Sequence, residues 1–572
     1  MDVFDRRIWK RFWQIARMYW FSDEKWKARG VLALLILLLL VFTGLGVAIN
    51  YANRNFFNAL SEKNSREFTT SLFMFLGVLV VATPVSALFD YVRKLLGINW
   101  RLWLTGHYLR RYFADRAYYH INNDREIDNP DQRISQDIAS FTGTSLDFLS
   151  LIVSSLIQLI AFIGILWSIS KILVAILVAY AAIGTAVTTL FGKRLVSLNF
   201  MQLRKDADFR YGLVHIRNNA ESIAFYRGEG REEHQVKERL QEAVGNSLRL
   251  IGWERNLAFF QKGYEYVILV LPYAIMAPLY FSGEIKMGVI MQAADAFIQV
   301  LAALKIVVTQ FQQISQFAAG VSRLESFDTA VEREGGVLRD PDNAAAPVIA
   351  SREERCLSLR QVTLLTPNYG QTLLREASAE VPSGGGLLIM GPSGAGKSSV
   401  LRAVAGLWTA GEGEISRPPL AEMIFLPQRP YMVLGSLRDQ LLYPLLDQET
   451  TDDELRQALV TVNLANLPER VGGFDAILGW GQLLSLGEQQ RLAFARLLLT
   501  RPRYAFLDEA TSALDVTNEA LLYRHLRQGG ATFVSVGHRP SLVEYHDNVL
   551  ELKGSGGWRF TTAREFTSGA PA

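Results

Sequence analysis

One eight-residue segment in the second half of the chain combines glycines, a lysine and serines in a spacing suited to holding phosphate groups. The segment Gly391–Ser398 reads GPSGAGKS, and it follows the apolar run Leu387–Met390, which we expect to form a strand. Glycines let backbone N–H groups curl around phosphate oxygens, and the start of the next helix adds a positive dipole end. Lys397 would neutralise the β- and γ-phosphates, and Ser398 would bind Mg²⁺. We therefore predict a site for ATP and Mg²⁺ formed by Gly391, Pro392, Ser393, Gly394, Ala395, Gly396, Lys397, Ser398 and Ser399.

Two adjacent acids end another apolar strand, at Asp508 and Glu509. Asp508 is predicted to hold Mg²⁺, and Glu509 to orient and polarise the attacking water. Between the two segments lies Leu484–Arg491, with the sequence LSLGEQQR. Its Ser485 and Gly487 can offer a hydroxyl and backbone N–H groups to a γ-phosphate ahead of a helix. Taken alone, the same segment also fits an ordinary helix N-cap.

The first half of the chain contains long apolar segments that would attach the predicted ATP site to a membrane. Hydrophobic residues make up 49% of the 572 residues, and they concentrate in long apolar runs before about residue 310. Six runs are long enough to cross a hydrocarbon layer of about 30 Å. They are Val31–Ile49, Ser71–Phe89, Phe148–Trp167, Ile172–Phe191, Tyr264–Phe281 and Met287–Val308. Lys and Arg cluster before the first run and after the second and fourth, which predicts that these segments are cytoplasmic.

Domain boundaries follow from these patterns. Residues 1–30 alternate basic and aromatic side chains and are predicted to form an amphipathic interfacial helix. Residues 31–330 form the six-helix membrane domain, whose two long inside loops are predicted to be helical extensions with elbows at Asn129-Pro130 and Gly228–Gly230. Residues 331–354 are a Pro/Gly/Ala-containing linker, and residues 355–572 are a soluble α/β domain. The fold class is thus an α-helical membrane domain plus an α/β P-loop nucleotide-binding domain.

Charge and cysteine content exclude some other functions. The net charge is only +3, without a basic stripe typical of nucleic-acid binding, so we predict no nucleic-acid partner. A single cysteine cannot build a disulfide framework or a cysteine-based metal site.

The sixth apolar run carries a polar stripe. Gln292, Asp295 and Gln299 fall within about 60° of one another on a helix. A carboxylate at membrane depth costs about 3 kcal/mol or more unless it faces water or a partner. We predict that the three residues line a hydrophilic substrate pathway; the alternative is a hydrogen bond between helices inside the bundle.

The order of motifs between residues 355 and 555 resembles the ATP-binding cassette (ABC) family. The family's signature is usually Leu-Ser-Gly-Gly, so Leu486 is a departure at the first glycine. The resemblance implies that Gln428 senses the metal and that His538 contacts the γ-phosphate, which adds both to Glu509 as catalytic residues. It also implies that Ser512–Asp515 is the D-loop. The position of the adenine-stacking aromatic is Thr366, and Tyr369 is the nearby substitute.

This family resemblance also implies an assembly. Family members sandwich ATP between the phosphate loop of one cassette and the signature of another, and this chain has one of each, so we expect a homodimer. The membrane domain is expected to have an exporter-like type IV fold. The segments Asn129–Ile134, Glu221–Gly228 and Leu484–Arg491 resemble the bacterial BacA/SbmA-related proteins and, more distantly, the peroxisomal fatty-acyl subfamily D transporters.

The prediction is ATP-driven uptake of a polar solute, of the cobalamin or hydrophilic-peptide type, across a bacterial inner membrane. The lipid bilayer and that solute are the expected partners, and the ATPase domain is expected in the cytoplasm. Two alternatives remain open: an exporter of lipid or acyl-CoA-like substrates, and an ATP-gated channel or regulatory membrane ATPase.

Overall fold

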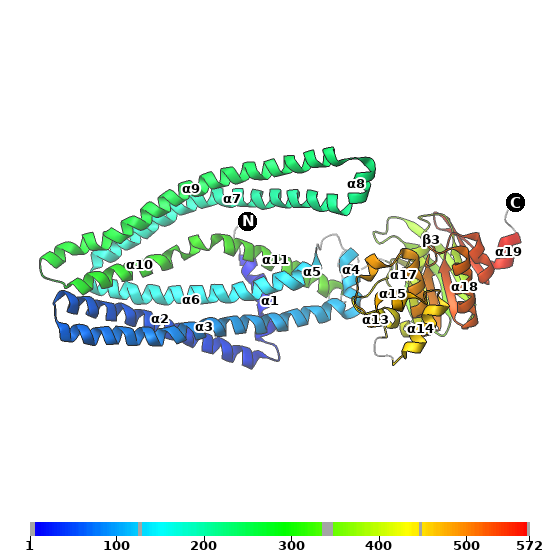
Figure 1. The fold of residues 1–572 in the computed structure, drawn as a ribbon, viewed down its shortest axis with the longest axis horizontal. Coiled ribbons are helices and arrows are strands. Elements are labelled where there is room, and N and C mark those ends of the chain that lie inside the picture. Colours follow the sequence, from blue (N-terminus) through cyan, green and yellow to red (C-terminus); the bar gives the residue numbers. More distant parts are fainter. Residues whose placement is uncertain (1–5, 124–128, 335–346, 446–448, 569–572) are drawn as a thin grey trace. The chain divides into compact units, whose positions relative to one another are not determined.

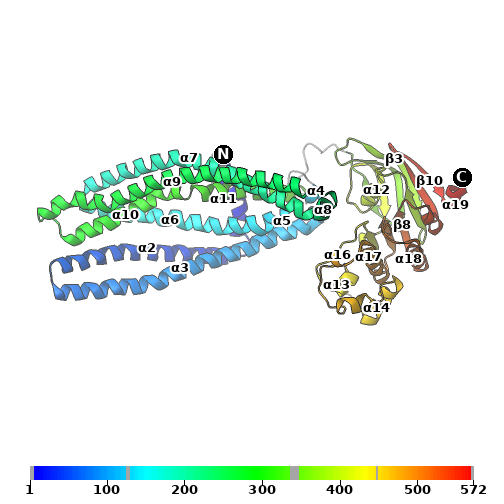
Figure 2. The same ribbon diagram turned by 45° about the horizontal axis from the view of Figure 1, so that its top comes forward.

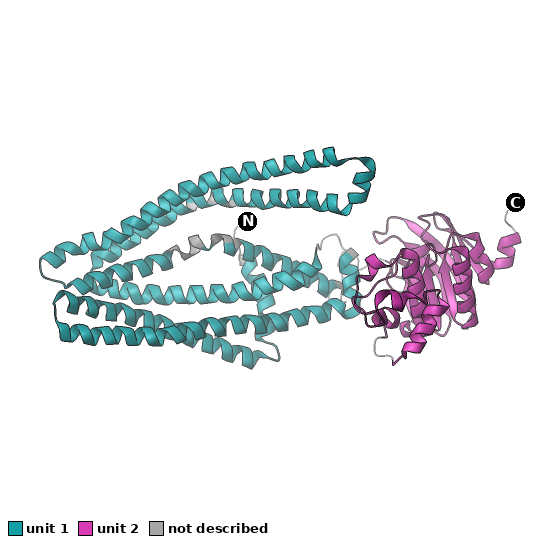
Figure 3. Ribbon diagram, in the orientation of Figure 1, with its two compact units in different colours: residues 1–340 teal, residues 341–572 magenta. Residues whose placement is uncertain are grey.

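The structure is a computed structural model that describes residues 6–123, 129–334, 347–445 and 449–568. It divides into two compact units, Met1–Asp340 and Pro341–Ala572 (Figure 3). In the described residues the first unit is helical, and the second combines helices with two β-sheets.

The first unit is built from very long helices. They are α1 (Arg6–Trp20), α2 (Lys25–Ser61), α3 (Ser65–Phe113), α6 (Ile138–Ile169), α7 (Lys171–Asn218), α9 (Glu229–Phe281), α10 (Met287–Thr309) and α11 (Phe311–Glu334). Short helical pieces join them: η1 (Ala114–Arg116), α4 (Ala117–Asn123), α5 (Pro130–Gln132), η2 (Arg133–Asp137) and α8 (Ala220–Tyr226). Six helical stretches of the described chain are long and apolar enough to cross a membrane, which confirms the six predicted spans.

The predicted helical extensions and elbows are present. Helix α3 continues past the second apolar run to Phe113, and its Pro84 does not interrupt it. Asn129 has a left-handed backbone (φ 44°) immediately before Pro130, which opens α5. Arg227 ends α8 with φ 53°, and α9 begins two residues later. Pro favours a helix start and a left-handed residue ends a helix, so both breaks follow from local backbone preference.

The helices pair in sequence order. Helix α2 packs along α3, and α7 packs along α9, as Figures 1 and 2 show from two directions. Helix α10 lies against α2 and α6. Helix α1 packs on α11, α2 and α3 through Ile15, Ala16 and Tyr19, each at most 2% exposed. The N-terminal helix ends at Trp20 and the first spanning helix begins at Lys25, which is earlier than residue 31 because the basic residues there also favour helix.

The second unit contains two sheets. The first has the strand order β1-β5-β2-β3, and its strands are β1 (Ala350–Glu353), β5 (Gly411–Arg417), β2 (Leu357–Leu365) and β3 (Thr372–Val381). The second has the order β10-β9-β4-β8-β7-β6. Its strands are β10 (Gly557–Thr562), β9 (Asn548–Gly554), β4 (Gly386–Met390), β8 (Thr532–Val536), β7 (Tyr504–Asp508) and β6 (Met423–Leu426). Only β10 is antiparallel to its neighbour in the second sheet.

The linker differs from the prediction at both ends. Helix α11 continues to Glu334, and β1 lies inside the predicted linker and pairs with β5. Residues 335–346, the middle of that segment, lie outside the described residues. The sequence did not predict β1 because all four of its residues are exposed, so the strand lacks the alternation of apolar and polar side chains that marks most strands.

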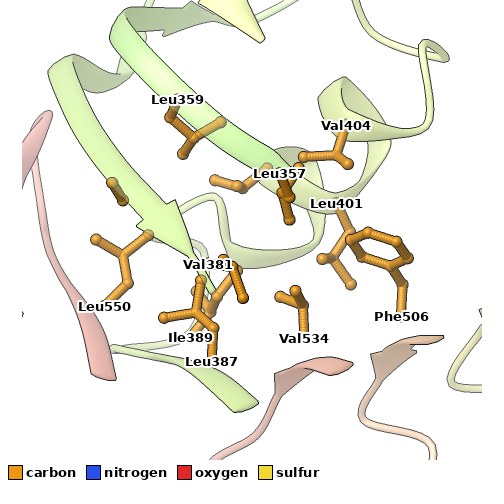
Figure 4. Close-up of a pocket in the computed structure, with 12 residues that line it drawn as sticks. Leu357, Leu359, Val381, Leu387, Ile389, Leu401, Val404, Phe506, Val534 and Leu550 are labelled. Atoms are coloured by element: carbon orange, nitrogen blue, oxygen red, sulfur yellow. The ribbon is translucent and has the colours of Figure 1, made fainter. Parts of the chain in front are cut away.

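Buried apolar strands form the centre of the second sheet. Strands β4, β7 and β8 are almost wholly buried, as expected for parallel strands covered on both faces. Between the two sheets the packing leaves an apolar cavity of about 20 Å³, toward which side chains such as Leu359, Val381 and Phe506 point (Figure 4). A void this small and dry holds at most a single water, so it is part of the core and not a ligand site.

Helices complete the second unit. They are α12 (Lys397–Val404), α13 (Leu437–Leu442), α14 (Asp452–Thr461), α15 (Leu467–Val471), α16 (Trp480–Leu483), α17 (Leu486–Thr500), α18 (Val516–Gln528) and α19 (Ala563–Ser568), with the short turns η3 (Leu420–Glu422) and η4 (Pro540–Tyr545). Figure 2 shows α13, α14 and α16 grouped in a helical part of this unit.

Candidate nucleotide site

The predicted phosphate loop connects β4 to α12. Gly391, Gly394 and Gly396 have φ angles of 145°, 79° and 93°, which L-residues with a side chain rarely adopt. At Gly391 a Cβ atom would also lie 2.3 Å from the carbonyl oxygen of Leu552. The backbone path of this loop therefore requires glycine at these positions.

The rest of the loop separates into an exposed rim and a buried base. Pro392 and Ser393 are exposed together with Gly394, whereas Ala395 and Ser399 are buried. Ala395 closes the turn, since its N–H donates to the Pro392 carbonyl at 3.3 Å. The exposed rim can therefore be reached by an incoming phosphate.

Lys397 begins α12 and bends back over the loop. Its Nζ donates to the carbonyl oxygens of Gly391 and Pro392, both at 2.9 Å. The residue is 6% exposed, and burial lowers the pKa of Lys397, while the nearby Glu509 and Asp508 carboxylates oppose that shift. The ammonium is thus held over the loop by neutral carbonyls, which can give way to phosphate oxygens of opposite charge.

Ser398 and Asp508 meet at the edge of this loop. The Ser398 hydroxyl donates to Oδ1 of Asp508 at 2.8 Å. Burial raises the pKa of Asp508, the hydrogen bond from Ser398 opposes that shift, and the charge of Glu509 adds to it. Among the described residues no group of three or more His, Cys, Asp or Glu side chains could hold a metal alone. A hydroxyl beside one carboxylate is the partial oxygen ligand set that suits Mg²⁺ when phosphate oxygens complete it.

Glu509 is held from two sides. Its Oε2 accepts a hydrogen bond from Gln428 Nε2 at 2.8 Å, and its Oε1 lies 3.0 Å from Nε2 of His538. The three residues follow β7, β6 and β8, which are adjacent and parallel, so their carboxyl ends meet at one edge of the sheet. The structure therefore brings together all three predicted catalytic residues.

The backbone at Glu509 is unusual for a glutamate. Its φ is 48°, in the left-handed region, and its N–H donates to the Val536 carbonyl at 3.1 Å. Such a conformation costs about 1–3 kcal/mol and persists where the surrounding structure enforces it. The strained turn points the carboxylate out of the strand end toward Gln428 and His538.

The signature segment forms the start of α17. Ser485 is the N-cap: its hydroxyl accepts from the Glu488 N–H at 3.3 Å, and Glu488 in turn accepts from the Ser485 N–H at 2.9 Å. Leu486, which stands where the family usually has the first signature glycine, is 39% exposed, so its side chain lies outside the core. At Gly487 a Cβ would lie 3.1 Å from the Ala513 carbonyl oxygen, so the glycine permits a close approach of the 512–515 loop. A free helix N-terminus is compatible both with an ordinary N-cap and with a contact to a γ-phosphate.

Two residues that the sequence analysis did not single out organise the site. Gln490 is fully buried and donates to the Gln428 carbonyl at 3.1 Å and to the Ser512 hydroxyl at 3.2 Å, while its Oε1 accepts from the Ala513 N–H at 3.0 Å. Arg539 donates to the carbonyls of Leu514 and Ser512. The sequence offered only their positions as signals, because Gln490 stands in the signature segment and Arg539 directly follows His538.

Tyr369 lies on the turn between β2 and β3. It is half-buried with φ 55°, and its N–H donates to the Thr366 carbonyl at 2.8 Å. The turn is close to the phosphate loop, because a Cβ at Gly396 would lie 3.1 Å from Cβ of Leu373, at the start of β3. Tyr369 therefore lies on the turn that leads into β3 beside the phosphate loop, and its contact with adenine stays a prediction.

Two of the three predicted pathway residues, Gln292 and Asp295, contact helix α2. Gln292 is 2% exposed, and Asp295 accepts a hydrogen bond from Asn50 at 2.6 Å. Arg54 reaches Oε1 of Gln292 at 3.5 Å. Asp295 and Gln299 are half-buried. The structure therefore shows contacts between helices at two of the three positions and leaves part of the stripe accessible.

Comparison with known proteins fits this geometry. A family model described as ABC transporter transmembrane region 2 matches residues 15–281, and the ABC transporter model matches residues 374–512. An uncharacterized ABC transporter ATP-binding protein of Synechocystis is 48% identical, over 94% of this chain and 82% of its own length. The chloroplastic ABC transporter D family member 2 of Arabidopsis thaliana is 42% identical, over 96% of this chain and 86% of its own length. The human lysosomal cobalamin transporter is 32% identical over 97% and 96%.

A solved structure shares the fold. A bacterial Atm1-family ABC exporter with ATP bound has a TM-score of 0.72 at 20% identity, covering 94% of this chain and 96% of that one. The exporter-like fold is thereby confirmed, whereas the grouping with BacA/SbmA proteins stays a prediction. With six spans, a phosphate loop and full-length relatives of one family, this chain is a half-transporter of the ATP-binding cassette family, which fuses a membrane domain to an ATPase domain and couples ATP hydrolysis to transport.

Proposed function

We propose that two copies of this chain form a homodimer that takes up a polar solute of the cobalamin type across a bacterial inner membrane. The observation that carries the dimer is the presence of a single phosphate loop and a single signature segment, at the starts of different helices, α12 and α17. In the family each ATP needs both elements from different cassettes, so a second copy completes the site.

The nucleotide chemistry follows from the positions of the side chains. The Ser398 hydroxyl and the Asp508 carboxylate would bind Mg²⁺, which supplies charge neutralisation for the phosphates. Gln428 would sense the ion from beside Glu509. Glu509, fixed between Gln428 and His538, would accept the proton of the attacking water, and His538 would face the γ-phosphate.

The substrate class rests on two observations. The human lysosomal cobalamin transporter is related over nearly the full length of both chains. In addition, α10 presents the polar stripe Gln292, Asp295 and Gln299, whose half-buried members can contact a polar solute. We propose that the exposed side of this stripe lines the pathway, while Asn50 of α2 holds Asp295 in place.

Orientation is proposed from the basic flanks. Lys25, Lys27 and Arg29 open the first spanning helix, which supports a cytoplasmic position for this end and for the cassette.

Direction and substrate can be tested in one experiment. Proteoliposomes loaded with labelled cobalamin would receive ATP and Mg²⁺ from outside, so that only transporters with external cassettes work. Uptake in the cell corresponds to ATP-dependent release from the vesicle against a cobalamin gradient, and Glu509→Gln vesicles are the matched control. Accumulation inside the vesicles would instead indicate export. Movement of acyl-CoA but not cobalamin would reject the substrate class, and release only down the gradient would indicate a channel.

A further inference from the structure

An arginine of α2, just after the turn that joins α1 to α2, is held between two aromatic rings. The guanidinium carbon of Arg29 lies 5.0 Å from the ring centre of Phe21 and 5.8 Å from that of Trp26. Its Nη2 donates to the Trp20 carbonyl at 3.1 Å. A guanidinium carries five N–H donors in a planar fork, so most of them remain available in this arrangement.

No carboxylate neutralises this group in the described part of the chain. Asp23 and Glu24 lie in the same turn, yet neither forms an ion pair within 4 Å of Arg29, Lys25 or Lys27. Both lysines are exposed. Lys25 precedes Arg29 by four residues and so lies on the same face of α2, which gives the site a held cation with a second, exposed cation next to it, an arrangement suited to a phosphate group.

The exposed aromatic rings around Arg29 indicate that this site lies at the membrane boundary. Phe21 and Trp26 are 63% and 76% exposed, although both are large apolar side chains. Trp9 and Trp13, one turn apart on α1, are 55% and 54% exposed. Exposed tryptophans beside the start of a spanning helix are typical of the boundary between acyl chains and headgroups.

The arrangement of side chains around α1 also indicates a position at the membrane surface. Ile15, Ala16 and Tyr19 are buried against the protein, and Trp9 and Trp13 follow around the helix at 100° per residue. Lys10, Gln14 and Arg17 form the next face and are exposed. A helix with protein, tryptophan and basic faces in this order lies in the bilayer surface with its basic face among headgroups.

We propose that Arg29, held between Phe21 and Trp26 and assisted by Lys25, binds the phosphate headgroup of an anionic phospholipid at the membrane surface. A zwitterionic phospholipid carries the same phosphate but adds a cation, which the two positive side chains repel. The surface is thus selective for net negative headgroups, and this selectivity is independent of the transported solute.

The test uses full-length protein purified in a neutral detergent. Phosphatidylglycerol or phosphatidylcholine with identical acyl chains is titrated in, and individual lipid-bound species are counted by native mass spectrometry. One basic residue near an anionic surface contributes about 1 kcal/mol, which corresponds to about fivefold in affinity. We expect the wild type to prefer phosphatidylglycerol by at least about fivefold and Arg29→Gln to lose most of that preference.

The matched control is Arg194→Gln, which removes an exposed arginine of α7 that lacks such a cage. It should bind phosphatidylglycerol like the wild type. Arg29→Lys keeps the charge but not the planar fork, and Trp26→Leu removes one ring; both should show an intermediate preference and normal ATPase activity. Equal phosphatidylglycerol binding by Arg29→Gln and Arg194→Gln would overturn the proposal, as would a wild type without preference. If Arg29→Gln does not fold, an unchanged preference in both Arg29→Lys and Trp26→Leu would overturn it as well.

Discussion

At the scale of single residues, Glu509 is the point on which the nucleotide site converges. A left-handed backbone, a hydrogen bond from Gln428 and a contact with His538 all fix one carboxylate. Each of these partners comes from a different strand end, so the position of the carboxylate depends on the sheet as a whole. Fixing a general base before the substrate arrives reduces the ordering that the reaction itself requires.

We predict that Glu509→Gln lowers ATP turnover by at least about 100-fold, because the amide cannot accept the proton of the attacking water. ATP binding should stay within about twofold, since the phosphate loop is unchanged. The measurements are steady-state phosphate release and equilibrium binding of a fluorescent ATP analogue. Glu544→Gln, at an exposed acid of the same unit, serves as the control. Wild-type turnover in Glu509→Gln would remove Glu509 from the catalytic role.

Gln490 is predicted to couple the loops around the site. Gln490→Leu would leave the Gln428 carbonyl and the Ala513 N–H without their buried partners, at a cost of about 1–3 kcal/mol. We expect a lower melting temperature and a several-fold loss of turnover per folded molecule.

The neighbouring Gln489→Leu is the matched control for Gln490→Leu. Gln489 belongs to the signature segment, but its side chain donates to the Gly481 and Leu484 carbonyls and forms no hydrogen bond in the described chain with Gln428 or with Ser512–Asp515. Its loss should reduce stability but leave turnover per folded molecule unchanged. Equal turnover in both variants would show that Gln490 only stabilises the fold.

At the scale of elements, His546 ties η4 to β8. Its ring nitrogens lie 2.7 Å from the Leu542 carbonyl and 2.9 Å from the Ser535 hydroxyl. The residue is 3% exposed, and burial lowers the pKa of His546 to about 4. The histidine is therefore neutral in the folded protein at neutral pH and charged in the unfolded chain below about pH 6.5.

This difference predicts acid sensitivity of the ATPase unit. Between pH 6.5 and 4 the unfolded chain binds a proton at this position and the folded chain does not, so stability falls as the pH is lowered. From pH 7.5 to 5 the contribution is about 2 kcal/mol. His546→Gln should show a smaller drop in the melting temperature over this range than the wild type, whereas His525→Gln, at a half-exposed histidine, should behave like the wild type. The same pH dependence in all three proteins would contradict the assignment.

The polar stripe on α10, formed by Gln292, Asp295 and Gln299, leads to a second prediction at the scale of elements. Asp295→Asn should alter transport while leaving ATPase activity near the wild-type level, because the amide can still bond to Asn50 but carries no charge toward the pathway. Single cysteines at 292, 295 and 299 in a Cys356→Ser background should differ in reactivity toward a membrane-impermeant thiol reagent. Position 292 should be protected by α2, whereas 295 and 299 should react from outside. Protection at all three positions in an active protein would show that the stripe only joins helices.

At the scale of the whole molecule, shared nucleotide sites predict complementation. A Lys397→Ala chain mixed with a Ser485→Ala chain should form dimers with one doubly damaged and one intact site. Some hydrolysis should return relative to either parent, measured on dimers purified through two different affinity tags. Purified mixed dimers as inactive as the parents would mean that both sites must act together or that the sites are not shared.

The sequence by itself determined the elements of this protein and the identity of its chemical groups. Six long apolar runs can be satisfied in a bilayer only as helices, and a strand followed by GPSGAGKS can adopt few backbone paths. These are local constraints, so they are readable without knowing what packs against what. The exposed strand β1 and the first turns of α2 escaped prediction because neither has a periodic apolar pattern.

Only the tertiary structure decided which distant groups meet. Gln428, Glu509 and His538 converge because three parallel strands end at the same edge, and strand order is not encoded in any single segment. Likewise, the sequence placed Gln292 and Asp295 on one face of a helix, but only the packing of α10 against α2 paired Asp295 with Asn50, 245 residues away. At Arg29 only the contact with Phe21 needed the turn between α1 and α2, since Trp26 precedes Arg29 by three residues on the same helix. Contacts of this kind depend on three-dimensional packing, which local preferences constrain but do not specify.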